Sequence, residues 1–138
     1  MAEQEEVVLD SSVAVKWFSA EKGTERALEV RDGHVRGRIS LLAPDLIVYE
    51  IANALRFRPG FDEQTVARAV EDLLDLQMDL LTPSRELIIR CSQLAFRFQI
   101  TIYDSCYLGL GELMGTKVLT SDKRFFDRAK GSGLLRLL

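Results

Sequence analysis

Val7–Phe18 reads VVLDSSVAVKWF, and the rest of the chain is interpreted outward from this stretch. The run from Val7 to Leu9 is apolar without polar alternation, which is typical of a strand buried on both faces of a parallel sheet. After it, Ser11 or Ser12 is expected to cap a helix. Asp10 therefore falls at the carboxyl end of a strand, the edge where open parallel sheets bind ligands. It would equally suit a turn aspartate that helps to cap the helix.

Short apolar runs alternate with helical patterns along the whole chain. Further strands are expected at residues 39–43, 78–81, 116–120 and 134–138. This alternation predicts an α/β fold, a three-layer α/β/α sandwich with a central, mostly parallel sheet of four to five strands. No internal repeat or low-complexity segment divides the sequence, so we expect residues 1–138 to form a single domain.

The composition limits the classes of function. The 138 residues carry 18 basic and 21 acidic side chains, a formal charge of −3, whereas nucleic-acid-binding domains are usually basic. A group of acids that binds a metal would itself make the charge negative. Two cysteines are too few for a disulfide framework, and a single histidine, His34, expected on a solvated surface, argues against a histidine-based metal site. The acidic start, MAEQEE, and the absence of a membrane-length apolar run predict a soluble, cytoplasmic protein with no membrane partner.

Four carboxylates stand at comparable places in this layout: Asp10, Glu50, Asp104 and Asp122. The aspartates also suit helix starts, where a carboxylate is a good cap. Glu50 is harder to explain, because it shares an otherwise apolar helix face with Asn53, and a buried acid is costly unless it is paired or binds a metal. Mg²⁺ and Mn²⁺ prefer oxygen ligands, so a shared cation site would account for all four acids.

The segments around these acids resemble the motifs of PIN domains, in wording similar to VapC-type toxins of prokaryotic toxin–antitoxin pairs. They are VVLDSSVAVKWF (7–18), PDLIVYEIANAL (44–55), ITIYDSCYLGLGELMG (100–115) and VLTSDKRF (118–125). The resemblance runs from about Val7 to the C-terminus, with the motifs in order. It departs at Ser105-Cys106, Gly109 and Gly111, where alanines are usual in the family.

The resemblance implies an endoribonuclease that hydrolyses RNA phosphodiester bonds with Mg²⁺ or Mn²⁺. Asp10, Glu50, Asp104 and Asp122 match the family's catalytic and metal-binding acids. Supporting polar positions are matched by Ser12, Asn53 and Thr120. A small antitoxin protein is the implied partner besides RNA, and a homodimer is implied as well, with Trp17, Phe57 and Phe61 as exposed apolar residues.

RNA must approach an acidic site, so basic residues are expected around it. Those near the motifs in sequence are Lys16, Arg56, Arg58, Lys123 and Arg124. Each of them equally suits an ordinary solvated surface charge.

Two alternative functions are compatible with the same layout. A receiver-type phosphoacceptor domain shares the length, the acidity and the parallel sheet, but it needs adjacent acids after the first strand, and Asp10 is followed by Ser11. A PIN-like fold that has lost catalysis would serve only in assembly. The intact set of four acids argues against this assembly role, and no lysine at a late strand end supports the receiver.

Overall fold

A five-stranded parallel sheet forms the centre of the structure, a computed structural model that describes residues 4–138. The strands are β1 (Glu5–Leu9), β2 (Ile39–Pro44), β3 (Asp79–Leu81), β4 (Lys117–Thr120) and β5 (Leu135–Leu137). Their spatial order is β3-β2-β1-β4-β5, and every neighbouring pair is parallel. The predicted α/β/α architecture is confirmed. The first three residues of the acidic start lie outside the described part of the chain.

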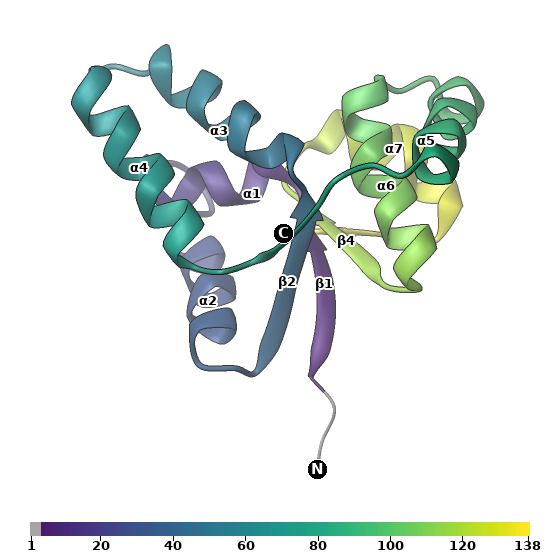
Figure 1. The fold of residues 1–138 in the computed structure, drawn as a ribbon, viewed down its shortest axis with the longest axis horizontal. Coiled ribbons are helices and arrows are strands. Elements are labelled where there is room, and N and C mark those ends of the chain that lie inside the picture. Colours follow the sequence, from purple (N-terminus) through teal and green to yellow (C-terminus); the bar gives the residue numbers. More distant parts are fainter. Residues whose placement is uncertain (1–3) are drawn as a thin grey trace.

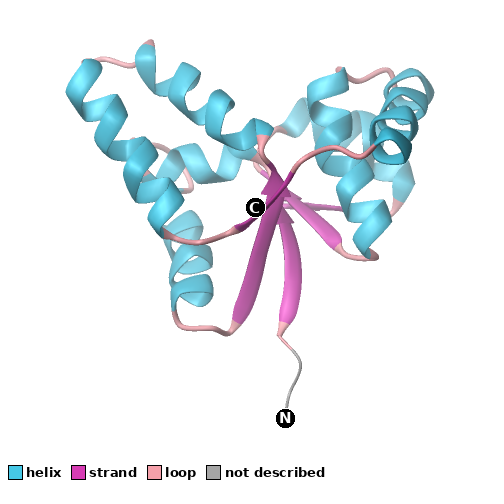
Figure 2. Ribbon diagram, viewed as in Figure 1, coloured by secondary structure: helices cyan, strands magenta, loops and turns pink. Residues whose placement is uncertain are grey.

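Helices cover both faces of this sheet (Figures 1 and 2). They are α1 (Ser11–Ala14), α2 (Thr24–Val35), α3 (Leu46–Arg56), α4 (Glu63–Asp75), α5 (Arg85–Phe98), α6 (Ile102–Met114) and α7 (Lys123–Ala129), with short 3-10 turns at Val15–Trp17 and Lys130–Ser132. Strands β2 and β3 are added in turn on one side of β1, and strands β4 and β5 are added in turn on its other side. Because such crossovers are right-handed, helices α1–α4 lie on one side and α5–α7 on the other.

The chain reverses direction between β1 and β4, which makes their carboxyl ends the switch point of the sheet. Leu9 of β1 pairs with Leu119 of β4, so the residues that follow them, Asp10 and Thr120, come side by side. The strands beneath are fully buried, with Val8 and Val118 both 0% exposed. In doubly wound sheets the crevice at such a switch point is the usual ligand site.

Two local predictions are wrong. No side chain of Ser11 or Ser12 caps α1: the N-cap is Asp10, without a side-chain cap bond, and the Ser12 hydroxyl is bonded to the Asp10 carboxylate instead. His34 is not a freely solvated surface residue, since its ring accepts the N–H of Leu41 and lies 2.7 Å from the carbonyl oxygen of Leu76. It joins the end of α2 to β2 and to the turn after α4.

The two glycines of α6 do not interrupt that helix, and they let it pack closely on its neighbours. A Cβ atom on Gly109 would lie 2.5 Å from the sulfur of Cys91 on α5. One on Gly111 would lie 2.6 Å from a methyl group of Val118 on β4. Real Cβ contacts are not this short, so glycine is required by packing rather than by backbone conformation.

The described residues include no helix that is both long enough and apolar enough to cross a membrane.

Candidate active site

The four acids singled out in the sequence line one cavity of about 180 Å³ at the carboxyl edge of the sheet. We call it the acid cavity; Ser11, Ser12, Val15, Ile51 and Ala54 complete its lining. Asp10 comes from the end of β1, Glu50 from the middle of α3, Asp104 from the first turn of α6, and Asp122 from the loop after β4. Residues from four separate parts of the chain therefore place carboxylates around the same space.

Asp10 is held from behind by two hydroxyl groups. Its side chain is only 3% exposed, and its Oδ2 atom accepts hydrogen bonds from Ser12 Oγ at 2.6 Å and Thr120 Oγ1 at 2.7 Å. Each hydroxyl in turn accepts a backbone N–H: Ser12 from Ser121 at 2.8 Å, and Thr120 from Asp122 at 3.0 Å. The loop after β4 thus fixes the hydroxyls, and the hydroxyls fix the carboxylate.

The second oxygen of Asp10, Oδ1, is the one that faces the cavity. The side-chain bonds to Asp10 all end on Oδ2. Within the described residues no side-chain oxygen is both sealed from solvent and without a hydrogen-bond partner. Oδ1 is therefore open to the acid cavity and available to a ligand, and the hydrogen bonds that Oδ2 accepts fix its orientation.

The surroundings of the acid cavity make ionisation of its acids unfavourable. Burial raises the pKa of Asp10 from 3.8 to about 7 against the opposing hydrogen bonds from Ser12 and Thr120, and the charges of Asp104 and Glu50 add to the rise. Burial also raises the pKa of Asp104 to about 6, with repulsion from Asp122 and Glu50 as the next causes. Raised carboxyl pKa values of this origin are typical of functional sites, and a cation in the cavity would offset them by favouring the ionised carboxylates.

Glu50 has a partner that the sequence analysis missed. The hydroxyl of Tyr107, a residue with no exposed surface, donates a hydrogen bond of 2.5 Å to Glu50 Oε1. Burial and the charges of Glu50 and Asp10 raise the pKa of Tyr107 well above its usual range, so the phenol stays a donor. Tyr107 lies three residues after Asp104, hence on the same helix face, and this spacing could have identified it.

Two of the aspartates differ in whether they also cap a helix. Asp122 caps α7, since its Oδ1 accepts the N–H groups of Arg124 and Phe125. Asp104 is not the cap of α6: Thr101 is, and its hydroxyl accepts the N–H of Asp104 at 3.0 Å. The carboxylate of Asp104 is therefore free of any capping duty, and it points to the acid cavity.

The donor set fits Mg²⁺ or Mn²⁺ in kind. Every polar group lining the acid cavity is an oxygen donor, which these hard cations prefer. In the described part of the chain no three His, Cys, Asp or Glu side chains already stand close enough together to hold one ion. Mg²⁺ is usually bound through only one or two carboxylates and keeps several waters, so a looser arrangement of four acids suits it.

The residues predicted to support the acids do not all lie at the acid cavity. Ser12 lines the acid cavity and Thr120 lies directly behind it. Asn53 is exposed and lines a different cavity between α3 and α4 with Arg56, whose guanidinium lies over the ring of Phe57. Helix α3 turns Asn53 away because one turn of 3.6 residues does not return to the same direction.

Of the remaining basic residues, the structure brings only Arg124 to the acids. Lys16 is 8% exposed and bonded to Glu21, and Arg58 is bonded to the same carboxylate. Lys123 is exposed and paired with Asp127 at 2.7 Å. Arg124 lines a cavity with Asp104 and Asp122, next to the acid cavity.

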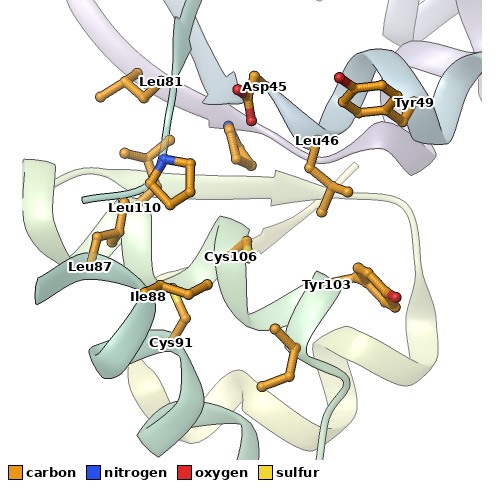
Figure 3. Close-up of a pocket in the computed structure, with 13 residues that line it drawn as sticks. Asp45, Leu46, Tyr49, Leu81, Leu87, Ile88, Cys91, Tyr103, Cys106 and Leu110 are labelled. Atoms are coloured by element: carbon orange, nitrogen blue, oxygen red, sulfur yellow. The ribbon is translucent and has the colours of Figure 1, made fainter. Parts of the chain in front are cut away.

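A second cavity at the same edge of the sheet is almost entirely apolar (Figure 3). It has a volume of about 270 Å³ and lies between the ends of β2 and β3, the start of α3, and helices α5 and α6. We call it the apolar cavity; its walls include Leu46, Tyr49, Ile88, Tyr103, Cys106 and Leu110. Tyr49 is 73% exposed and Tyr103 61% exposed, so its mouth presents two aromatic side chains to solvent.

Comparison with known proteins agrees with this fold. Residues 7–131 match the PIN domain family. Ribonuclease VapC3 from Pyrobaculum aerophilum is 29% identical over 126 residues, which cover 88% of this chain and 93% of the relative. Among solved structures, Mycobacterium tuberculosis VapC20, described as a sarcin-ricin loop cleaving toxin, superposes with a TM-score of 0.73 at 12% identity, covering 93% of this chain and 95% of that one. PAE2754 from Pyrobaculum aerophilum gives a TM-score of 0.66 at 22% identity, covering 92% and 81%.

Proposed function

Because this chain belongs to the PIN-domain family, we propose that it is a metal-dependent endoribonuclease and the toxin of a VapBC-type toxin–antitoxin pair. The observation that carries the proposal is the convergence of Asp10, Glu50, Asp104 and Asp122 on one cavity. The similarity to a protein named ribonuclease VapC3, along nearly the whole length of both chains, supports RNA as the substrate.

The four acids have different roles in this proposal. Asp10, through Oδ1, and Asp104 would hold Mg²⁺ or Mn²⁺ most directly, and Glu50 and Asp122 would bind it through water or form a second metal position. When bound, the cation lowers the pKa of a water molecule and neutralises charge that develops on the phosphoryl group. Ser12 and Thr120 keep Oδ1 directed at the cavity by engaging Oδ2.

The attacking group is water rather than a side chain. Ser12, a hydroxyl on the cavity wall, is held in place, since it donates a hydrogen bond to the Asp10 carboxylate and accepts one from the N–H of Ser121. The single histidine, His34, is bonded to the main chain of Leu41 and Leu76 and lines no part of the acid cavity. The carboxylates orient the water by accepting its hydrogen bonds, and attack opposite the leaving oxygen breaks the phosphodiester bond.

The apolar cavity supports a homodimer. Ile88, Ile102, Tyr49 and Tyr103 are exposed around it, and an apolar concave patch of this kind is typical of an association surface. The residues first expected on that surface fit less well: Trp17 is 9% exposed and belongs to the core, and Phe61 is half-buried, while Phe57 is 70% exposed but follows the last residue of α3, outside the cavity lining. A small antitoxin protein, proposed from the similarity to VapC proteins, is the second partner.

The receiver-type alternative does not fit the topology. Receiver domains have the strand order 2-1-3-4-5, whereas this sheet has the order β3-β2-β1-β4-β5. The non-catalytic alternative keeps the fold and predicts no cleavage, which makes activity the deciding measurement.

A metal titration on defined RNAs tests the proposal. Cleavage should require Mg²⁺ or Mn²⁺, and Asp10→Asn or Asp104→Asn should lower the rate by at least about a hundredfold, because each removes charge stabilisation at the reacting phosphate. Asp72→Asn, an exposed aspartate of α4, makes the same change of charge away from the cavity and should leave the rate unchanged. Cleavage that persists in excess EDTA would refute the metal site, and wild-type protein inactive on every RNA would favour the assembly role.

A further inference from the structure

A second polar cavity adjoins the acid cavity and has the opposite charge on its far wall. It measures about 190 Å³ and shares Asp104 and Asp122 with the acid cavity. The rest of its lining is Ile100, Thr101, Arg124, Phe125 and Arg128. We call it the arginine cavity. A ligand long enough to occupy both cavities would contact carboxylates in the acid cavity and guanidinium groups in the arginine cavity.

The two arginines lie on one face of α7, four residues apart. Both are exposed, and within residues 4–138 neither forms an ion pair with a carboxylate at 4 Å or less. Lys123 on the same helix shows the contrast, because it is paired with Asp127 at 2.7 Å. Like charges at this spacing repel each other on a helix, so an anion between Arg124 and Arg128 would stabilise the arrangement.

Arg128 is anchored in a way that leaves most of its donors available. Its Nη1 donates to the carbonyl oxygen of Gln99 at 2.7 Å. Gln99 ends α5 in a left-handed conformation, with φ of 54°, which turns that carbonyl outward. A guanidinium has five N–H donors in a planar fork, so this bond fixes the group while other donors remain for a ligand. The floor beneath is Phe125, which is 1% exposed.

We propose that the arginine cavity binds a phosphate of the RNA strand next to the phosphate that is cleaved, and so sets the register of the strand. This rests on the proposed nuclease function. Paired guanidinium groups match the geometry of phosphate oxygens better than lysines do. A strand whose reacting phosphate lies in the acid cavity must continue past the shared aspartates, and there Arg124 and Arg128 offset the repulsion that Asp104 and Asp122 exert on it.

The test compares Arg124→Gln/Arg128→Gln with the wild type on one RNA oligonucleotide with a mapped cleavage site. KM should rise by about tenfold or more with kcat little changed, because the two arginines bind the strand rather than the reacting group. The salt dependence of binding should weaken by about 0.7 in the log–log slope for each phosphate of a single strand that the variant no longer binds. Lys130→Gln, which removes one positive charge just after α7 and outside the cavity, should change neither quantity.

Chemically altered substrates locate the phosphate that the arginines bind. A single neutral methylphosphonate next to the cleaved bond should raise KM for the wild type and add nothing further in the double variant. Placing it on the 5′ or the 3′ side tells which neighbour the cavity holds. Unchanged KM and salt slope in the double variant, or a full methylphosphonate effect that persists in it, would overturn the proposal.

Two further measurements separate this inference from the nuclease proposal. The rise in melting temperature produced by Mn²⁺ should be at least as large in the double variant as in the wild type, because the arginines do not hold the metal and their positive charges beside Asp104 and Asp122 oppose a cation. Fluorescence anisotropy with the same RNA decides the inference even without cleavage: weaker binding by the double variant supports it, and equal binding refutes it. If the wild type binds no RNA at all, both proposals fall.

Discussion

The acid cavity and the apolar cavity lie at the same edge of one sheet and share two helices, yet their linings are opposite in character. Helix α3 gives Glu50 to the acid cavity and Tyr49 to the apolar one. Helix α6 gives Asp104 to the first and Tyr103 to the second. One step along a helix turns the side chain by about 100°. Adjacent residues therefore line two cavities of opposite character, and the two cavities are fixed to each other by the same backbone.

Both cavities destabilise the folded state of the isolated, metal-free chain, for different reasons. In the acid cavity, burial and mutual repulsion oppose ionisation of Asp10 and Asp104. At the apolar cavity, large side chains such as Tyr49 and Tyr103 remain in water. A cation would relieve the first cost and a second copy of the chain the second. Measurements that change one cavity and leave the other untouched show whether the two are separable.

The largest effect is expected from pH on the metal-free protein. The pKa of Asp10 is 3.8 ordinarily and about 7 in the folded chain. Between these values the unfolded chain binds fewer protons than the native one, so the free energy of unfolding should fall as the pH rises from about 4 to 7, by a few kcal/mol. Asp104 adds to the fall up to about pH 6.

Urea denaturation in EDTA across this pH range measures the effect. Asp10→Asn keeps an acceptor for Ser12 and Thr120 but removes the charge, so its stability should be less dependent on pH. Millimolar Mg²⁺ should restore the wild type near pH 7 by binding the native state. Equal pH dependence in wild type and variant would show that Asp10 is not the group that titrates.

A charge placed in the apolar cavity should weaken the homodimer without affecting the acids. Ile88→Glu on α5 puts a carboxylate where the partner would bury it, and we expect the dissociation constant to rise about thirtyfold or more, about 2 kcal/mol. Ile89→Glu is the matched control, since Ile89 is the next residue, is 52% exposed and does not line the cavity. Sedimentation analysis distinguishes the two. A monomeric wild type would refute the association surface itself.

The smallest effect is expected from Tyr107→Phe, which removes the donor to Glu50 and keeps the packing. Glu50 is half-buried and recovers some hydration, so the loss of stability should be about 1 kcal/mol. The cleavage rate should fall about tenfold, as for other changes to groups that orient metal ligands. A double-mutant cycle with Glu50→Gln checks the cause, because additive effects would show that the two side chains do not act together.

The sequence predicted the positions of the acids well because a local pattern determines them. Asp10 ends an apolar strand, and the parallel arrangement of the strands brings its end next to Thr120. The surroundings of those acids depend on which side chains bond to one another in the folded chain, and the sequence pattern does not determine that. From the sequence, Lys16 was a candidate for binding RNA, but in the structure it is paired with Glu21. Ser12 was a candidate helix cap, but its hydroxyl is bonded to the Asp10 carboxylate instead.

Helix α6 shows the same limit in packing. Gly109 and Gly111 differ from the alanines usual in the family and suggest a weaker helix when read alone. The structure shows that each faces an atom too close for any Cβ, Cys91 on one side and Val118 on the other. Cys106 of the same helix lines the apolar cavity, and a local pattern gives no sign of that cavity.

The place of β1 in the sheet has a consequence for the synthesis of the protein. β1 is made early, but it is a central strand, and its partner β4 begins at Lys117. The hydrogen bond between Asp10 and Thr120 spans 110 residues. While the ribosome is still translating the earlier segments, Asp10 has neither its hydroxyl anchors nor its neighbouring acids. A nascent chain therefore has no assembled acid cavity, and the cavity is complete only when β4 and the residues that follow it have joined the sheet.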